Sequence, residues 1–304
     1  TLLIKDPTMP PIAYTHLTNR GIISVTGSDS RDFLQGIISN DITLVSPNKT
    51  IYAALLTPQG KYLFDFFISQ SGEKLLIECE KDRLPDLMRR LRIYKLRANA
   101  DLVDETETYS ICAIWGDDAA QATGLDNERG LAHEISGGTQ FIDPRLNTAG
   151  VRSVLPIEAA GAQLQSLAAE PESLCDYDLH RLKLGLPDAS RDLVVDKAIL
   201  IESGFDELNG IDWNKGCYMG QELTARTKYR GLVKKRLTSV FIEGAAPEPG
   251  TPIMVGDKNA GEMRSSNAGH GIALLRLDQL NNEAAEYICD QAILRPNKPK
   301  WAEF

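Results

Sequence analysis

Two apolar, aromatic-rich runs separated by a turn sequence constrain the fold of this chain more than any other feature. The runs are Ile51–Leu56 and Tyr62–Ile68, and Pro58-Gln59-Gly60 stands between them. Proline presets the backbone angle that begins a tight turn, and glycine tolerates the positive φ that often closes it. Runs of this length that are rich in β-branched and aromatic residues are typical of strands. The sequence therefore predicts a hairpin of two strands in the N-terminal third.

The segments around this hairpin complete a predicted N-terminal domain. Ile22–Val25 and Leu75–Cys79 are short apolar runs of the kind found in strands. Asp29 or Ser30 can cap a helix after the first of them, and an amphipathic helix follows the second. This order predicts a βαβββα unit over residues 1–105, with its helices on one face of an antiparallel sheet.

The remaining sequence predicts two further domains. Tyr109–Trp115 is the first strand of a second α+β unit over residues 106–230, in which helices are expected at 158–169 and 173–184. Residues 231–304 contain short apolar runs between glycine, proline and asparagine, a pattern typical of a small β-barrel. Since 304 residues also exceed one comfortable core, we expect an α+β protein of three domains.

The densest cluster of chemically active side chains lies near the end of the second unit. It is the run Lys215-Gly216-Cys217-Tyr218-Met219-Gly220-Gln221-Glu222, with Arg226 four positions further on. The segment Gln221–Tyr229 reads as a short polar helix, which places Cys217 just before a helix N-terminus. The positive end of a helix and nearby cations favour a thiolate. We therefore predict that Cys217 is reactive, with Lys215 and Arg226 as its neighbouring cations.

Each of these residues has an ordinary structural alternative. A free cysteine usually packs as a small hydrophobe. Glu222 and Arg226 have the i,i+4 spacing of a surface ion pair worth about 0.2–0.5 kcal/mol, and Gln221 and Glu222 also complement the helix dipole. The combination of a thiol, two glycines and three charged groups within twelve residues favours a functional site over packing alone.

The pattern K-G-C-Y-x-G-Q-E-x-x-x-R resembles the signature of the YgfZ-type folate-binding proteins. That family is related in fold to the glycine cleavage T-protein, an aminomethyltransferase, and includes mitochondrial iron-sulfur assembly factors. The resemblance covers most of residues 15–240, and its further segments are Arg20–Gly27, Phe33–Gly36, Ser39–Asp41, Thr57–Lys61 with Asp65, and Arg181–Pro187. It implies a ring of two ferredoxin-like α+β domains and a small C-terminal β-barrel, with a folate site in the central channel.

The resemblance implies that the cofactor is tetrahydrofolate or a one-carbon derivative. A reduced pterin is flat and carries N–H donors on its edge, so it needs a carboxylate acceptor and aromatic walls. Asp65 lies in an otherwise apolar strand, where a charge is costly unless paired, and it is the predicted pterin acceptor. A solvated position at the sheet edge is the alternative. Trp213 and Tyr218 are the predicted walls, and Gln221 and Glu222 belong to the same site.

One departure separates this chain from the aminomethyltransferases that it resembles. Lys183 stands where those enzymes have an acidic pterin contact, and an ammonium group cannot accept the pterin N–H bonds. We therefore expect a tetrahydrofolate-binding factor that supports assembly or repair of iron-sulfur clusters in client proteins. Cys217 would act as its thiol, while Lys215 and Arg226 hold the thiolate and the anionic folate tail. A folate-dependent aminomethyltransferase or demethylase and an accessory protein for tRNA modification are the alternatives.

The net charge of the chain limits the kinds of partner that it is expected to bind. A net charge of -9 argues against nucleic acid as a direct ligand. A local basic strip nevertheless follows the signature, and it reads either as a ligand or RNA contact or as a solvated strand edge. The strip consists of Lys228, Arg230, Lys234, Lys235 and Arg236.

The cysteines and histidines do not have the spacing of a metal site. There are five cysteines without a CxxC pair and four histidines without HExxH spacing, so we expect no permanently bound metal. Cys79 and Cys112 lie in apolar runs and are expected in the core. No run approaches the length of a membrane span. We expect a monomer in the bacterial cytoplasm, or in the mitochondrial matrix of a eukaryote, with iron-sulfur client proteins or cluster assembly factors as partners.

Overall fold

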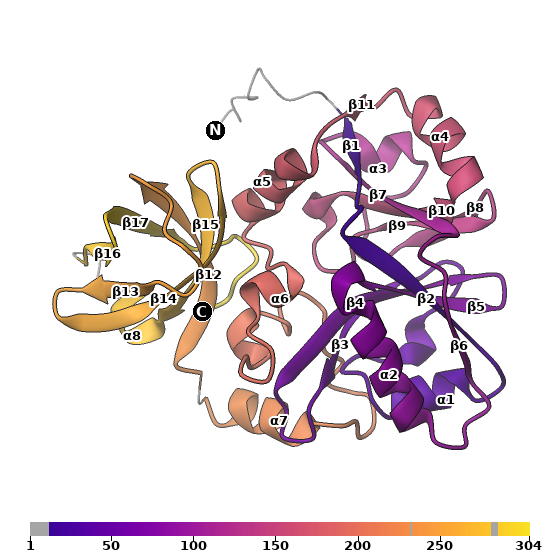
Figure 1. Ribbon diagram of the computed structural model, residues 1–304, viewed down its shortest axis with the longest axis horizontal. Coiled ribbons are helices and arrows are strands. Elements are labelled where there is room, and N and C mark those ends of the chain that lie inside the picture. The colour runs from indigo at the N-terminus through magenta and orange to yellow at the C-terminus, as the bar shows by residue number, and fades with distance from the viewer. Residues whose placement is uncertain (1–11, 232, 281–284) are drawn as a thin grey trace.

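The computed structural model describes residues 12–231, 233–280 and 285–304. Two open sheets and one closed barrel make up its β-structure. Figure 1 shows the barrel at the left, beside the two open sheets and the helices that connect them. This is the predicted α+β architecture with a C-terminal barrel.

The first sheet contains the predicted hairpin. Its strand order is β3-β4-β5-β2-β6, and every pair is antiparallel. The turn closes as expected, because the Gly60 amide donates to the Thr57 carbonyl and the Thr57 amide donates to the Lys61 carbonyl, both at 2.8 Å. The strands are β2 (Arg20–Thr26), β3 (Ile51–Leu56), β4 (Tyr62–Ser71), β5 (Lys74–Glu80) and β6 (Asp101–Asp104).

The helices of this unit pack on one face of the sheet, as predicted. Their apolar side chains join one buried cluster with those of β2 to β5. Asp29 occupies the N-cap position of the first helix, but its carboxylate accepts from the Asn99 amide at 2.8 Å and does not cap the helix. The helical segments are α1 (Ser30–Gln35), η1 (Ile42–Leu44), η2 (Lys81–Arg83) and α2 (Leu84–Lys95).

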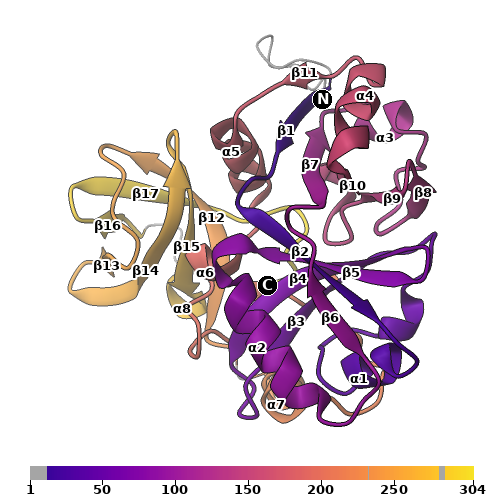
Figure 2. The same ribbon diagram turned by 45° about the vertical axis from the view of Figure 1, so that its right-hand side comes forward.

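The second sheet has the order β11-β1-β7-β10-β9-β8. Its strand β1 lies outside the unit predicted over residues 1–105, because it pairs antiparallel with β7 and parallel with β11. The strands are β1 (Ala13–His16), β7 (Tyr109–Trp115), β8 (Ala132–Ile135), β9 (Gly138–Ile142), β10 (Val151–Pro156) and β11 (Glu170–Pro171). Figure 2 shows β1 beside β7, above the first sheet.

Helical segments lie between the strands of this sheet and between the sheet and the barrel. The two predicted at 158–169 and 173–184 form close to those positions, and the second begins with a capping box at Ser173 and Asp176 and ends at Gly185, where φ is 71°. The polar helix predicted over Gln221–Tyr229 is also present. The helical segments are α3 (Ala119–Ala122), η3 (Asn147–Ala149), α4 (Ile157–Ser166), α5 (Leu174–Leu184), α6 (Ala189–Asp192), η4 (Ile201–Ser203) and α7 (Gln221–Tyr229).

The C-terminal barrel closes in the order β12-β15-β14-β13-β16-β17. Its interior is apolar and includes Val240, Ile253 and Met263. The elements are β12 (Lys235–Glu243), β13 (Pro252–Val255), β14 (Lys258–Asn267), β15 (His270–Arg276), α8 (Leu277–Leu280), β16 (Tyr287–Cys289) and β17 (Ala292–Asn297). Among the described residues, no helix has the length and apolar character needed to cross a membrane.

Candidate functional site

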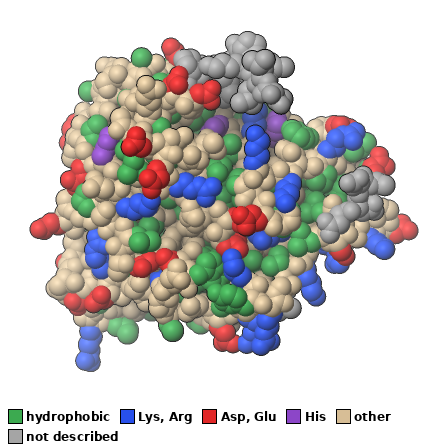
Figure 3. All heavy atoms as spheres, turned by 180° about the vertical axis from the view of Figure 1, so that it is seen from behind, with side chains coloured by type: hydrophobic (Ala, Val, Ile, Leu, Met, Phe, Trp, Pro, Cys, Tyr) green, Lys and Arg blue, Asp and Glu red, His purple; other side chains and the backbone are tan. Residues whose placement is uncertain are grey.

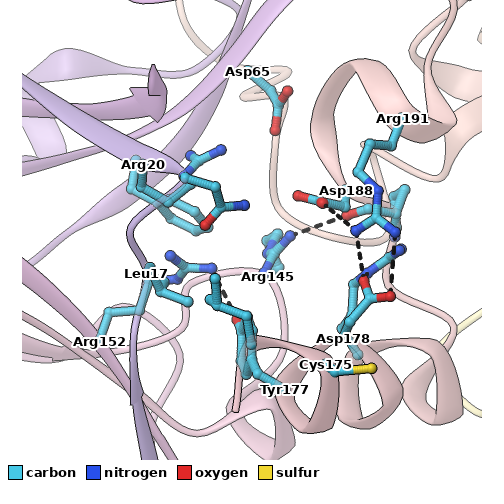
Figure 4. A pocket seen from close by; sticks show the side chains of 15 residues that line it. Leu17, Arg20, Asp65, Arg145, Arg152, Cys175, Tyr177, Asp178, Asp188 and Arg191 are labelled. Carbon is cyan, nitrogen blue, oxygen red and sulfur yellow. Dashed lines mark hydrogen bonds and ion pairs between the residues drawn. The ribbon is translucent and has the colours of Figure 1, made fainter. Parts of the chain in front are cut away.

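A cavity of about 300 Å³ lies where the two open sheets meet α5. Figure 4 shows charged side chains from both sheets and from the helical connection around it. Fifteen residues line it: Leu17, Asn19, Arg20, Asp65, Phe67, Arg145, Arg152, Leu174, Cys175, Tyr177, Asp178, Arg181, Pro187, Asp188 and Arg191. We call it the arginine cavity.

Asp65 reaches this cavity from the middle of β4. It is buried, with 5% of its surface exposed, so the alternative of a solvated sheet edge does not hold. The hydroxyls of Tyr52 and Tyr62 donate to its two oxygens at 2.8 and 2.6 Å. Burial and the nearby Asp65 charge raise the pKa of both phenols well above their ordinary value, which keeps them protonated as donors. A carboxylate has about four acceptor sites, so Asp65 can still accept from a ligand.

Three arginines surround the aromatic wall formed by Phe67. The guanidinium carbons of Arg152, Arg145 and Arg20 lie 4.2, 4.9 and 6.0 Å from its ring centre. Arginine planes within about 6 Å of an aromatic face gain cation-π attraction, and the burial of these side chains from water strengthens it. The ring and the three guanidinium groups therefore form one charged, rigid wall.

Two buried carboxylates balance these arginines. Glu78 accepts from Arg20 Nε at 3.0 Å and from Arg152 Nη1, while Asp143 accepts from Arg145 Nη2 at 2.8 Å. Burial alone would raise the pKa of Asp143, but Arg145 and Arg152 outweigh it and hold that pKa below its ordinary value. The positive charges of the three arginines are therefore largely balanced by ion pairs with two carboxylates.

The opposite wall comes from α5 and the segment after it. Asp178 pairs with Arg181 Nε and with Arg191 Nη1, both at 2.7 Å, and Arg191 also reaches Asp188 at 3.1 Å. Tyr177 accepts from Arg152 Nη2 at 3.0 Å and so connects the two walls. The cavity therefore offers a free acceptor, aromatic surface and fixed donors within one small volume.

Lys215 of the signature is a structural residue. Its ammonium donates to the carbonyl oxygens of Gln35, Ile38 and Asn40 at 2.9, 2.7 and 2.8 Å. Gln35 is the last residue of α1, and Ile38 and Asn40 lie just after it, so Lys215 satisfies carbonyls at the end of that helix. Burial lowers the pKa of Lys215 to about 8, and the amine remains charged at neutral pH. With its three hydrogens used, Lys215 has no donor for the Cys217 thiolate or a folate tail, contrary to the prediction.

The signature segment also packs against the turn of the predicted hairpin. Gly220 has φ of 83°, and a Cβ atom added there would lie 2.5 Å from the Thr57 carbonyl oxygen. Tyr218 is buried, with its ring 5.1 Å from the Lys215 ammonium, and the Met219 amide donates to the Gly36 carbonyl at 3.1 Å. These contacts tie the segment to the first sheet.

Of the other predicted residues, Glu222 and Arg226 are exposed on α7, and Gln221 and Trp213 are half-buried. Glu222 and Arg226 form the i,i+4 ion pair given above as their alternative, with side chains 84% and 50% exposed. Trp213 packs edge-on against Tyr229 at 5.9 Å, and Lys228 lies over its ring. Of the predicted site residues, all of which the structure describes, Asp65 alone lines the arginine cavity. Arg226, Trp213, Tyr218, Gln221 and Glu222 lie outside the arginine cavity, and a folate contact for them stays a prediction.

Cys217 is exposed, although Lys215 and Tyr218 on either side of it are buried. Cys79 and Cys112 are buried, as predicted, and burial raises the pKa of these thiols to about 12 and about 11. Cys175, which lines the arginine cavity, is the other exposed thiol. The signature thus holds its own thiol at the surface while its neighbours serve the fold.

Sequence reasoning missed the arginine cavity apart from Asp65. The same signal that singled out Asp65, a charge inside an apolar strand, also marks Glu78 in β5 and Arg152 in β10. Lys183, the departure noted above, is exposed on α5 and is not among the cavity residues.

The basic strip is partly neutralised. Arg236 is buried and pairs with Glu207 at 2.6 Å, and Lys228 pairs with Asp206 at 3.2 Å. Figure 3 shows acidic and basic side chains interspersed over much of the face that it presents. Among the described residues, no group of three or more His, Cys, Asp and Glu side chains is arranged to hold a metal ion.

Comparison with known proteins identifies relatives for the whole chain and for its barrel. Residues 234–304 match the family described as CAF17, C-terminal beta-barrel domain. The chain is 36% identical over 247 residues to the mitochondrial iron-sulfur cluster assembly factor IBA57 homolog of Neurospora crassa, which covers 77% of this chain and 55% of the relative. It is 32% identical over 336 residues to the IBA57 homolog of Coccidioides immitis, and this match covers 93% of this chain and 77% of that relative. The chain thus spans little more than half of the first relative.

A solved structure agrees with the described fold. The aminomethyltransferase T of the glycine cleavage system from Bartonella henselae superposes with a TM-score of 0.78. The match covers 97% of this chain and 88% of that chain at 16% sequence identity. At this identity the similarity concerns the fold, and it confirms the predicted aminomethyltransferase-type architecture.

Proposed function

Because the chain belongs to the family of the iron-sulfur cluster assembly factor IBA57, we propose that it supports the assembly of iron-sulfur clusters in client proteins. The proposal includes two working parts: tetrahydrofolate held in the arginine cavity and the exposed thiol of Cys217. Iron-sulfur client proteins or other assembly factors are the proposed partners, and the cluster is cargo that the protein does not retain.

The observation that carries the role of the thiol is its exposure in a segment where Lys215 and Tyr218 are buried. Lys215, Tyr218 and Gly220 account for the structural role of the signature, and none of their contacts requires a cysteine at position 217. A thiol held at the surface on a well-fixed backbone can bind iron or attack a partner without a large rearrangement.

The arginine cavity fits tetrahydrofolate by its chemistry. Asp65 keeps acceptor sites for the N–H donors of a pterin edge, and Phe67 and Tyr177 provide apolar surface for its faces. Arg191, at the cavity margin and 45% exposed, is placed to meet an anionic tail. Bound tetrahydrofolate would supply one-carbon chemistry, while the residues of this chain bind and orient it.

The proposed cellular location follows from the names of the relatives. Those compared above are named as mitochondrial proteins, so we favour the mitochondrial matrix over the bacterial cytoplasm expected from composition. The aminomethyltransferase and tRNA-modification alternatives gain no specific support, since a structural match at 16% identity carries the fold alone.

The substitution Asp65→Asn is expected to weaken tetrahydrofolate binding by about 1.5–3 kcal/mol, because a charged acceptor is lost while the size is kept. Isothermal titration calorimetry with tetrahydrofolate measures this directly. Asp101→Asn, at an exposed position of the same sheet, is the matched control and should bind as the wild type does. Equal affinity of Asp65→Asn and Asp101→Asn would exclude Asp65 from the binding site.

A deletion experiment tests the proposed function as a whole. Cells that lack their own relative and carry this chain should regain the activity of iron-sulfur enzymes, while glycine cleavage is independent of it. Restored glycine cleavage without restored iron-sulfur enzymes would contradict the proposal and favour an aminomethyltransferase.

A further inference from the structure

A second cavity, of about 310 Å³, lies between the barrel and the segment that precedes and includes η4. Its volume is at the lower end of the range of about 300–1,000 Å³ for small-molecule pockets. Its charged lining residues are Asp192, Lys197, Glu202, Lys235, Glu262 and Arg264. We call it the barrel cavity.

The register of the barrel strands builds one wall. Leu274 of β15 pairs with Leu237 of β12 and with Glu262 of β14, so these three side chains form one row across the sheet. Leu237 and Leu274 pack with the central apolar cluster and not with the barrel interior. Arg264 follows Glu262 by two positions, and Lys235 precedes Leu237 by two. The outer face of the barrel therefore presents an apolar patch with charges at its ends.

Arg264 is the residue that points to a ligand. It is buried, with 6% of its surface exposed, and its Nη1 donates to Glu262 and, at 3.4 Å, to the Met263 carbonyl. Its Nε is buried and has no hydrogen-bond partner among the described residues. A buried donor of a charged group without a partner is costly, and such groups normally indicate a bound water, ion or ligand.

Other charges at the cavity are available to a ligand. Lys197 and Lys235 are exposed at its margin, and Glu202 is half-buried and forms no hydrogen bond or ion pair with the described residues. Burial raises the pKa of Glu202. Asp192 is different, because Arg181, the Asp188 amide and both donors of Ser265 already occupy its oxygens at 2.6–3.0 Å. The cavity thus combines three cations with one free acceptor.

We propose that the barrel cavity binds a small hydroxy acid or amino acid. The ligand carboxylate would pair with the guanidinium of Arg264, which lines the cavity, Lys197 and Lys235 would add positive potential, and the ligand hydroxyl or ammonium would donate to Glu202. A simple anion lacks the donor that Glu202 requires, and a cation is repelled by Arg264. This site is separate from the tetrahydrofolate site, and its residues come from other parts of the fold.

L-malate is a suitable probe, because it has two carboxylates and one hydroxyl. Isothermal titration calorimetry with the full chain should show saturable binding at one site. Arg264→Gln should weaken this binding at least tenfold, and Lys235→Ala should weaken it about threefold. Lys258→Ala, an exposed lysine on β14 outside the cavity, should leave the affinity unchanged. Succinate, which lacks the hydroxyl, should bind less tightly than malate.

Two further measurements are needed in case the Arg264→Gln variant is unstable or malate binds at the tetrahydrofolate site. If Arg264→Gln lowers the melting temperature strongly, Lys235→Ala and Glu202→Gln carry the test, since neither side chain is fully buried. Malate binding that persists in Asp65→Asn and in the presence of tetrahydrofolate supports a separate site. Loss of malate binding in Asp65→Asn, no saturable heat with malate, or equal affinity of the wild type, Lys235→Ala and Glu202→Gln would overturn the proposal.

Discussion

Replacing Lys215 with methionine is expected to lower the free energy of unfolding by about 3–5 kcal/mol. The substitution keeps most of the apolar side chain but removes the donor shared by the carbonyls of Gln35, Ile38 and Asn40. A hydrogen bond to a charged group contributes about 1.5–3 kcal/mol, and a buried acceptor left unpaired adds its desolvation cost. Relaxation of the loop after α1 towards water offsets part of the loss. Urea denaturation followed by circular dichroism measures the change.

Lys234→Met provides the matched control for this prediction. Lys234 is exposed, so its substitution should change stability by no more than about 0.5 kcal/mol. A loss below about 1 kcal/mol in Lys215→Met would show that the three carbonyls find other donors. In that case the lysine of the signature would need a role other than the structural one assigned above.

Cys217→Ser is expected to abolish the support of iron-sulfur enzymes in cells while leaving the folded protein intact. Serine keeps the size and hydrogen bonding of the side chain but is a poor ligand for iron and a poor nucleophile at neutral pH. Because Cys217 is exposed, no core contact is lost, and both the melting temperature and tetrahydrofolate affinity should equal those of the wild type. The activity of an iron-sulfur enzyme in cells that depend on this chain is the readout.

Cys175→Ser is the comparison variant, since Cys175 is the other exposed thiol; because Cys175 lines the arginine cavity, the tetrahydrofolate affinity of this variant is measured alongside. It should restore the iron-sulfur enzymes as well as the wild type does. Brief iodoacetamide treatment of the native protein should modify Cys217 and Cys175 and spare the three buried thiols. Full complementation by Cys217→Ser would mean that the thiol has no chemical role in this function.

Secondary structure was predicted correctly where the local sequence pattern is strong. The hairpin around Pro58-Gln59-Gly60, the helix Gln221–Tyr229 and the C-terminal barrel all form. The barrel strand β14 was missed because its sequence, Lys258–Asn267, is mostly polar and has no continuous apolar run. Strand β6 was missed because it is short and mostly exposed.

The candidate site was predicted less well than the fold, and the reason is physical. Proximity in sequence suggested that Lys215, Cys217 and Arg226 act together, but a turn and a helix start point neighbouring side chains in different directions. Lys215 turns into the protein, and Arg226 turns to Glu222 on the surface. The arginine cavity collects residues as far apart as Arg20 and Arg191. Only the tertiary fold brings such residues together.

The position of β1 has a consequence for how the chain folds during synthesis. This strand leaves the ribosome before the first sheet does, yet its partner β7 begins only at Tyr109. The first sheet can form as soon as β6 is made, while β1 remains unpaired until the following strand appears. Pairing over so many residues closes a large loop and is slow compared with local hairpin formation. An unpaired strand is also prone to aggregate, so β1 is open to wrong pairing until β7 has been made.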